Sequence, residues 1–334
     1  MKNMSAGFYV EKAVFKQERT SLFTTTWQLF GHVDQVQEQG SYISGDIAGM
    51  AVFVIRSHDN QLRAFRNVCR HRGARLLEPG TGECKRLRCP YHNWVYETTG
   101  ALTHAPWFGE DQEFNVEDWP LEAIAVEQWR GLLFISLNPQ ETLTEQLRAS
   151  IKELSAVPME NYHLCDTQVL EFEANWKIYT DNFVEGYHIP GIHPEFFKAI
   201  DFSRFETTAH DGLVKMTAPP RENLFYQGRW LWMWPNWTLS LFDGGMNTSR
   251  INPLDENRTQ LIYRFYFDDN SDDSRTKRLD TIERNLDVIR EDFGICIATH
   301  QNYSTDAYTP GPLSPLHEKG VNYFQQRYMK VINS

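Results

Sequence analysis

The stretch Cys69–His92, CRHRGARLLEPGTGECKRLRCPYH, carries the most specific pattern in the chain. It holds two short pairs, Cys69-x-His71 and Cys89-x-x-His92, with seventeen residues between them. Each pair sets one thiolate and one imidazole on a tight turn, so two facing turns offer two sulfur and two nitrogen ligands. Such a set can hold a tetrahedral zinc ion. It can also hold a two-iron cluster in which two thiolates bind one iron and two imidazoles bind the other.

The order of these ligands favours the iron cluster, because in the usual zinc pattern both Cys precede both His. The flanking segments NVCRHRGARL (67–76) and RCPYHNWVYETTGAL (88–102) resemble the Rieske domain of the α subunits of Rieske non-heme iron oxygenases. This resemblance implies a [2Fe-2S] Rieske cluster, and the residues that would bind it are Cys69, His71, Cys89 and His92.

Length and composition limit the class of protein. A chain of 334 residues is long enough for two domains with sizeable cores. No N-terminal stretch has the pattern of a signal peptide, and no apolar run is long enough to span a bilayer. Three further cysteines without regular spacing argue against disulfides, so we expect a cytoplasmic protein. The net charge of −11 disfavours nucleic acid or an anionic membrane as a partner.

The segment 63–92 is basic, with eight Lys and Arg against two Glu. It is either a solvated face whose arginines pair locally or a docking surface for the electron donor, a reductase or ferredoxin. Complementary charge would speed docking and make it sensitive to salt. No G-x-G-x-x-G follows a predicted strand, so the donor's nicotinamide and flavin sites belong to a separate chain.

Alternating apolar and polar residues with a turn at 58–60 predict strands early in the chain. Residues 25–140 are therefore predicted to form a small all-β domain with the cluster at its tip. Residues 1–24 and 141–334 are predicted to form a second domain. There, strands followed by long helices predict an α+β fold of the helix-grip type, an antiparallel sheet covered by helices.

A second informative stretch is NWKIYTDNFVEGYHIPGIHPEF (175–196). Its pattern predicts a helix that stops at Pro190, with His188 in the last turn and His193 beyond a bend. In the later helix 275–300, Asp292 lies at the margin of an apolar stripe, where a carboxylate is costly unless paired or metal-bound. Two imidazoles and one carboxylate are typical of the facial triad of non-heme Fe(II) oxygenases. The alternatives are two ordinary polar histidines and an aspartate that reaches solvent or an arginine.

The same family resemblance covers nearly the whole chain, and it implies that His188, His193 and Asp292 bind a mononuclear Fe(II) that activates O₂. It also implies that Glu185 links a cluster histidine of one subunit to His188 of its neighbour, and hence a homotrimer. Many members carry Asp at this position.

Two other polar residues of this stretch have weaker assignments. Asp181, seven residues before His188, is the second candidate for the link, and Asn182 is expected to face the iron.

The substrate is less well defined by the sequence. Alternation places Trp230, Trp232 and Trp234 on one face of a strand, where most would be core beneath the C-terminal helix. The candidates for a substrate pocket are Phe183, Tyr187, Trp230, Trp232, Trp234 and Phe242. Aromatic faces suit a planar aromatic compound by stacking or a quaternary ammonium by cation–π contact.

The segment DNFVEGYHIP (181–190) resembles the choline-, betaine- and carnitine-type monooxygenases. Hydroxylation or oxidative demethylation of a methylated amine is therefore the favoured reaction. Aromatic ring hydroxylation, as a mono- or dioxygenase, is the alternative. A Rieske electron-transfer protein without oxygenase activity is a remote one.

Overall fold

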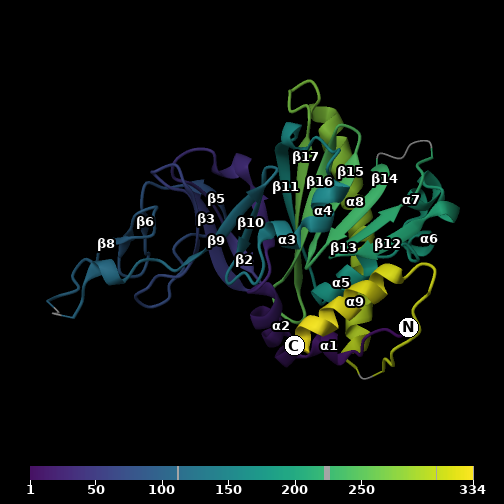
Figure 1. The fold of residues 1–334 in the computed structure, drawn as a ribbon, viewed down its shortest axis with the longest axis horizontal. Helices are drawn as coiled ribbons and strands as arrows, with labels where there is room; N and C mark the ends of the chain where they lie inside the picture. Colours follow the sequence, from purple (N-terminus) through teal and green to yellow (C-terminus); the bar gives the residue numbers. More distant parts are fainter. Residues whose placement is uncertain (111–112, 222–225, 306, 334) are drawn as a thin grey trace. The chain divides into compact units, whose positions relative to one another are not determined.

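The structure is a computed structural model that describes residues 1–334 except 111–112, 222–225, 306 and 334. It divides into two compact units (Figure 1), one formed by Thr24–Gln140 and the other by Met1–Phe23 with Glu141–Ser334. The predicted fold class, an all-β unit and an α+β unit with an antiparallel sheet, is confirmed.

The unit Thr24–Gln140 is built on an antiparallel seven-stranded sheet in the order β1-β10-β9-β4-β3-β2-β5. Its strands are β1 Gln28–His32, β2 Ser41–Ile47, β3 Met50–Arg56, β4 Leu62–Arg66, β5 Gly80–Glu83, β9 Ala123–Trp129 and β10 Leu132–Ser136. A smaller three-stranded sheet consists of β6 Leu87–Arg88, β7 Val95–Tyr96 and β8 Leu102–His104. Short 3₁₀ helices span Val33–Val36 and Val116–Asp118. The predicted turn at 58–60 joins β3 to β4, and Asn60 adopts the left-handed backbone (φ 65°) that asparagine tolerates.

The other unit contains a second antiparallel sheet in the order β11-β17-β16-β15-β14-β13-β12. Its strands are β11 His163–Phe172, β12 Glu206–His210, β13 Leu213–Thr217, β14 Tyr226–Met233, β15 Trp237–Phe242, β16 Gly245–Pro253 and β17 Thr259–Phe267. The helices are α1 Gly7–Val10, α2 Lys12–Glu18, α3 Leu143–Gln146, α4 Arg148–Glu153, α5 Trp176–Phe183, α6 Ile189–Ile192, α7 Pro194–Ala199, α8 Arg275–Tyr303 and α9 Lys319–Ile332. Single turns of π- or 3₁₀-helix span Arg19–Phe23, Met159–Asn161 and Phe202–Arg204.

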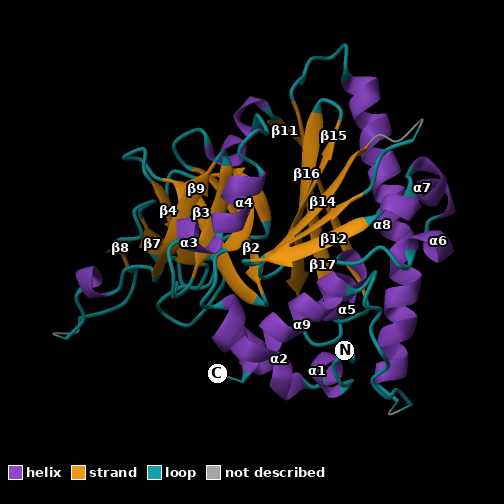
Figure 2. Cartoon of the chain, turned by 45° about the vertical axis from the view of Figure 1, so that its right-hand side comes forward, coloured by secondary structure: helices purple, strands orange, loops and turns teal. Residues whose placement is uncertain are grey.

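Helices α5, α8 and α9 gather on one side of this sheet (Figure 2). The rings of Trp176 in α5 and Trp232 in β14 both pack edge-on against Phe324 in α9. Buried residues recur at three- and four-residue spacing along α8, from Ile282 to Tyr303. This apolar stripe buries one face of α8 against the sheet, and it carries Asp292 inward with it. Within the described part of the chain, no helix is long and apolar enough to cross a membrane.

Candidate metal centres and cavity

The two predicted ligand turns of the Thr24–Gln140 unit have the same backbone hydrogen bonds. In the first turn, Cys69 N–H donates to the Ala74 carbonyl (2.8 Å) and Gly73 N–H donates to the Cys69 carbonyl (3.0 Å). In the second, Cys89 N–H donates to the Trp94 carbonyl (2.8 Å) and Asn93 N–H donates to the Cys89 carbonyl (3.1 Å). Gly73 and Asn93 occupy the equivalent position with positive φ (75° and 58°), which closes each turn tightly.

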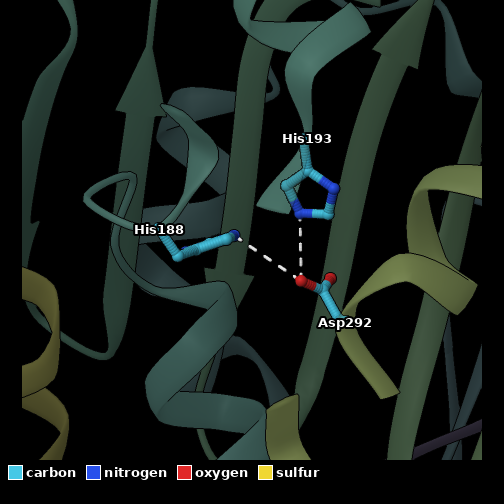
Figure 3. A group of neighbouring side chains, drawn as sticks. All are labelled: His188, His193 and Asp292. Atoms are coloured by element: carbon cyan, nitrogen blue, oxygen red, sulfur yellow. Dashed lines mark ion pairs between the residues drawn. The ribbon is translucent and has the colours of Figure 1, made fainter. Parts of the chain in front are cut away.

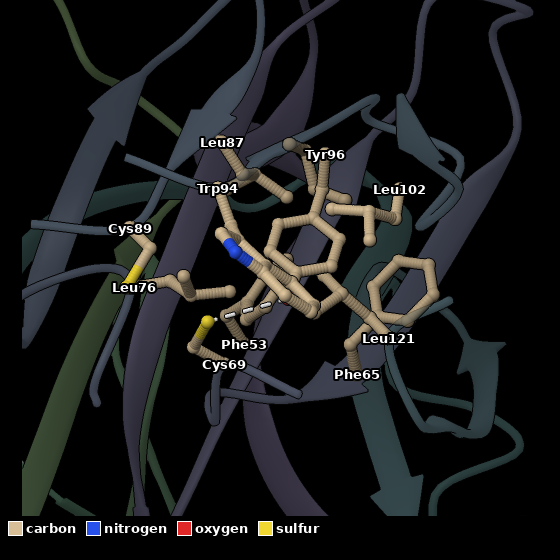
Figure 4. Close-up of a cluster of buried hydrophobic side chains, with 11 residues drawn as sticks. Phe53, Phe65, Cys69, Leu76, Leu87, Cys89, Trp94, Tyr96, Leu102 and Leu121 are labelled. Atoms are coloured by element: carbon tan, nitrogen blue, oxygen red, sulfur yellow. Dashed lines mark hydrogen bonds between the residues drawn. The ribbon is translucent and has the colours of Figure 1, made fainter. Parts of the chain in front are cut away.

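These equivalent turns bring the four predicted cluster ligands together. Cys69 and Cys89 are buried in an apolar core with Trp94 and Tyr96 (Figure 4). The His71 and His92 rings lie 4.5 Å apart between centroids, and His71 stacks on Trp94. The Nδ1 atoms of both histidines are buried and have no hydrogen-bond partner among the residues that the structure describes. Two thiols and two free imidazole nitrogens at one place are the donor set that a Rieske cluster needs.

Tyr96 contributes a hydrogen bond to this centre. Its oxygen accepts the Arg70 N–H (3.0 Å) and lies 3.3 Å from Cys69 Sγ. Because the backbone donor approaches the oxygen, the phenol's own hydrogen is free to donate to the sulfur. Hydrogen bonds to cluster sulfurs help to set the reduction potential.

The second predicted site lies in the segment after α5. The prediction of one helix up to Pro190 was wrong: α5 ends at Phe183, and Pro190 lies in the first turn of the short helix α6. Pro is well suited there because it lacks the backbone N–H that other residues leave unpaired in the first turn of a helix. His193 follows between α6 and α7. Gly186 is required in this bend, since a Cβ there would lie 2.4 Å from the Phe205 ring.

The bend places His188 and His193 beside Asp292 of α8 (Figure 3). His193 Nε2 lies 3.0 Å and His188 Nε2 3.7 Å from Asp292 Oδ1. Over the described ranges of the chain, that buried oxygen has no hydrogen-bond partner of acceptable geometry. The three side chains offer one ligand atom each within 4.8 Å of one another. This donor set fits a mononuclear Fe(II).

Each histidine turns its other nitrogen to a glutamate. His188 Nδ1 lies 2.6 Å from Glu185 Oε1, and His193 Nδ1 lies 2.6 Å from Glu291 Oε2. Carboxylates in this position fix the ring orientation and the tautomer of metal-binding histidines. Burial disfavours the charged form of His193, but the adjacent carboxylates of Asp292 and then Glu291 raise its pKa. The sequence reasoning missed Glu291, although an acidic residue directly before Asp292 was a usable signal.

Because α5 ends at Phe183, Glu185 and His188 do not share a helix face. Both lie between α5 and α6, where Glu185 Oε2 accepts the backbone N–H of His188 (3.2 Å) and that of Tyr187. The carboxylate therefore caps the bend and orients the His188 ring at once.

Asp181 faces another part of this unit. It accepts hydrogen bonds from Tyr9 Oη (2.6 Å) and Gln325 Nε2 (3.1 Å) rather than approaching the triad. It therefore makes none of the contacts with His188 that Glu185 makes.

A cavity adjoins the triad, with about 630 Å³ of empty space when the open solvent at its mouth is included. Its polar lining includes Asn182, Glu185, Ser240 and Asn247. Its aromatic lining comprises Tyr179, Phe183, Phe196, Phe205, Tyr226, Trp230 and Tyr263. Phe196, Tyr226 and Trp230 meet edge-to-face with centroids 5.3 to 5.9 Å apart and form an aromatic corner.

Only part of the predicted pocket set lines this cavity. Phe183 and Trp230 do. Tyr187 is exposed and stacks on His317, and Phe242 packs on Phe267. Trp232 packs on Phe324 and Trp234 lies under Arg327, so both are core beneath α9. The contributions from α7, β16 and β17 come from residues distant in sequence, which periodicity alone could not select.

Six of the eight basic residues in segment 63–92 fall into two groups. Four arginines form local ion pairs: Arg63 with Asp59, Arg66 with Glu122, Arg75 with Asp46, and Arg86 with Glu97. Next to the ligands, exposed Arg70 and Arg72 lie over the rings of Trp119 and Tyr91. In the described ranges, neither forms an ion pair.

Comparisons with known proteins agree with this geometry. Residues 26–120 match the Rieske [2Fe-2S] domain family, and residues 159–223 and 204–334 match the ring hydroxylating alpha subunit (catalytic domain) family. Choline monooxygenase from Atriplex hortensis is 28% identical, over 96% of this chain and 75% of that protein. The oxygenase subunit of carnitine monooxygenase from Escherichia coli (strain K12) is 29% identical, over 98% and 92%. A crystal structure of the quaternary ammonium Rieske monooxygenase CntA superposes with a TM-score of 0.89 at 26% identity, covering 99% of this chain and 95% of that one.

Proposed function

We propose that this protein is a terminal monooxygenase acting on a quaternary or methylated amine. The proposal starts from its family, because the chain belongs to the Rieske non-heme iron oxygenases and corresponds to their α subunit. The protein would hydroxylate or oxidatively demethylate this substrate with electrons from a separate reductase. One observation carries the choice of substrate: the aromatic corner of Phe196, Tyr226 and Trp230 shares a cavity with the carboxylates of Glu185 and Asp292. The relatives named for choline and carnitine support the same class.

The residues divide the work between the two units. Cys69, Cys89, His71 and His92 would hold the cluster, and His188, His193 and Asp292 would hold the iron. When bound, the cluster supplies single electrons and the iron supplies O₂ activation.

The cavity's own task is to hold a methyl group of the substrate toward the triad. Ring faces attract a cation, and the nearby carboxylates add negative charge. An ammonium ion therefore replaces its lost hydration with aromatic faces, while apolar neighbours such as Ile289 and Met216 keep water away from the reacting carbon.

A single turnover tests this proposal. Iron-loaded protein is reduced chemically and exposed to O₂ with a panel of trimethylammonium compounds and aromatic acids, and the products are identified by mass spectrometry. We expect a demethylated amine or an aldehyde. A phenol or ring diol as the only product would contradict the proposal.

Two adjacent residues of α7 provide a matched pair for the same assay. Phe196→Leu removes a ring from the cavity, and we expect about tenfold weaker use of the ammonium compound. Phe197→Leu changes a neighbouring ring that packs on Phe202 outside the cavity lining. It should leave turnover near that of the wild type.

We further propose that three copies form a ring in which Glu185 links His188 to a cluster histidine of the neighbouring subunit. Three features support this. Glu185 already holds His188 Nδ1. The cluster-bearing unit exposes Tyr91, Trp107 and Phe108, apolar surface of the kind that interfaces cover. The related CntA was described in terms of inter-subunit electron transfer.

The variant Glu185→Gln tests the proposed link between subunits. The variant is expected to keep both metals and the ring, to have its cluster reduced normally, and to pass few or no electrons to the iron. Stopped-flow oxidation of the reduced cluster by O₂ with substrate measures this step. Wild-type oxidation rates in Glu185→Gln would refute the linking role.

We also propose that Arg70 and Arg72 guide the electron donor to the cluster. Both are exposed, lie beside ligand residues and form no ion pair within the described part of the chain. The initial rate of cluster reduction by the donor should fall as salt rises, and more gently in Arg72→Gln. A rate independent of salt would contradict the proposal.

A further inference from the structure

One row of side chains crosses the sheet beneath the cavity. Met216 of β13 pairs with Trp230 of β14, Trp230 with Ser240 of β15, and Ser240 with Asn247 of β16. Residues directly opposite each other in an antiparallel pair point to the same face. All four line the cavity. The row changes from apolar and aromatic at one end to polar at the other.

The orientation of the Asn247 amide is fixed by its neighbours. In α8, Asn285 Nδ2 donates to the Thr281 carbonyl (2.8 Å), which can only accept. Asn285 Oδ1 therefore faces the sheet, where it accepts from Tyr226 Oη (2.6 Å) and from Asn247 Nδ2 (2.7 Å). A flipped Asn247 would set two oxygen acceptors against each other. Asn247 therefore uses Nδ2 for the bond to Asn285, and its Oδ1 is the atom that takes no part in this bond.

That Oδ1 has no partner. It is buried and accepts no hydrogen bond within the described part of the chain. Asn247 itself is only 2% exposed. A buried acceptor left unpaired costs free energy and calls for an explanation. A donor carried by a molecule in the cavity would supply the missing bond, and the neighbouring Ser240 hydroxyl could share it.

The side-chain charges of the cavity lining bear on whether the substrate can carry a carboxylate. Among its described lining residues there is no Lys or Arg. Lys215 and Arg229 alternate with Met216 and Trp230, so they point to the opposite face, where both bind Glu153. The undescribed residues 222–225, ENLF, include neither Lys nor Arg.

The arginines of strands β16 and β17 do not add a positive charge to the cavity lining. Arg250 and Arg264 lie at positions that alternate with the Asn247 face, since Asn247 pairs with Phe265 and Thr248 with Arg264. A substrate carboxylate at this end of the cavity would lose its hydration without gaining a charged partner, which is unfavourable.

We propose that Asn247, together with Ser240, is a specificity residue that accepts a hydrogen bond from a hydroxyl of the substrate. The preferred substrate is then a methylated amino alcohol rather than an ammonium compound that ends in a carboxylate. This rests on the proposed function, because it assumes that the aromatic corner binds the ammonium group. It goes further by assigning the other end of the molecule.

Three trimethylammonium compounds that differ at one substituent test the assignment: 2-hydroxyethyl, ethyl and carboxymethyl. Binding to the anaerobic protein is measured by calorimetry, and turnover is measured separately. We expect the hydroxyethyl compound to bind at least about tenfold more tightly than either of the others. Equal or tighter binding of the ethyl or carboxymethyl compound would overturn the specificity role and leave the ammonium class standing.

Substitutions of the two polar cavity residues test which side chain produces the preference for the hydroxyethyl compound. Asn247→Ala should remove most of the preference for hydroxyethyl over ethyl while leaving ethyl binding within a few-fold of the wild type. Ser240→Ala provides a second test that leaves the Asn285 bonds intact, and we expect a partial loss of the same preference. In the control Thr248→Val, on the opposite face and bonded to Tyr266, the preference should persist.

The outcomes separate the two proposals. If both cavity variants keep the full preference, Asn247 and Ser240 do not read the hydroxyl. If none of the three ammonium compounds binds or reacts, the proposed function itself fails, and this assignment fails with it.

Discussion

At the scale of single residues, each imidazole of the candidate iron site is oriented by a glutamate on the side away from Asp292. Glu185 and Glu291 each bind the Nδ1 of one histidine at 2.6 Å, which leaves both Nε2 atoms directed at Asp292. The two glutamates differ in their surroundings. The Glu185 side chain is 10% exposed, whereas that of Glu291 is 43% exposed at the surface of α8.

Replacement of Glu291 should weaken iron binding without removing a ligand. In Glu291→Gln, the amide cannot hold the His193 ring with a charged acceptor, so we expect about 10- to 100-fold lower iron affinity. Competition with a chelator, followed by metal analysis, measures the change. Glu283→Gln, an exposed residue of the same helix paired with Arg290, is the control. Unchanged affinity in Glu291→Gln would contradict the orienting role.

The phenol of Tyr96 acts on the other centre. Tyr96→Phe removes the hydrogen bond to Cys69 Sγ that stabilises electron density on the sulfur. The reduction potential should fall by an amount on the order of 60 mV, which corresponds to one charge-assisted hydrogen bond. Tyr42→Phe is the control, since Tyr42 packs against the same core. Potentials come from a redox titration followed by EPR, and equal values in both variants would refute the effect.

At the scale of elements, buried polar contacts tie α1 and α2 to α5 and α9. Glu18 of α2 accepts from Trp176 Nε1 (3.0 Å), Lys177 Nζ (2.5 Å) and Tyr328 Oη (2.6 Å). One turn further along α5, Asp181 accepts from α1 and α9. Because α5 leads directly into the iron-site bend, this network fixes where the bend begins.

Asp181 gives the network a pH dependence. Loss of hydration raises its pKa from the ordinary 3.8 to about 7, against the opposing effects of bonds from Tyr9 and Gln325 and the charge of Lys177; Glu318 adds to the rise. The folded state therefore binds this proton more tightly than the unfolded state. Its contribution to stability is full below about pH 4 and is lost as the pH rises through 7.

Asp181→Asn removes that titration. The melting temperature of the variant relative to the wild type should rise steadily from pH 4 to pH 7 and then level off. Calorimetry across this range measures it, with the exposed Asp287→Asn of α8 as the control. A difference that does not change with pH would show that Asp181 is charged throughout.

At the scale of the whole molecule, the proposed ring predicts complementation between defective subunits. His92→Ala should lack an intact cluster, and Asp292→Ala should lack the iron, so each alone should be inactive. Rings assembled from both by co-expression should regain part of the activity, because in the proposed ring the cluster of one subunit would face the iron of the next. Differently tagged chains allow mixed rings to be purified and assayed. Mixed rings that hold both centres and remain inactive would rule out transfer between subunits.

Much of the fold could be predicted from local patterns. Alternation predicted the strands on either side of the turn at 58–60, where β3 and β4 lie, and the Trp-bearing strand β14, and helical spacing predicted α8. Strands β12 and β16 were not predicted. β16, GMNTSRINP, is buried at all nine positions between two neighbours, so it lacks the alternation that marks a half-exposed strand.

The sequence by itself determined the chemistry of this protein: two Cys/His turns, two histidines around a Pro-Gly bend, and one acidic helix residue. These signals can be recognised in the sequence because each depends on spacing within a few residues. Tertiary structure alone decided the rest. It ended α5 at Phe183, brought Glu291 to His193, and selected which aromatic rings meet. The physical reason is that the cavity joins elements far apart in the chain, and strand register across β13–β16 sets which side chains face it.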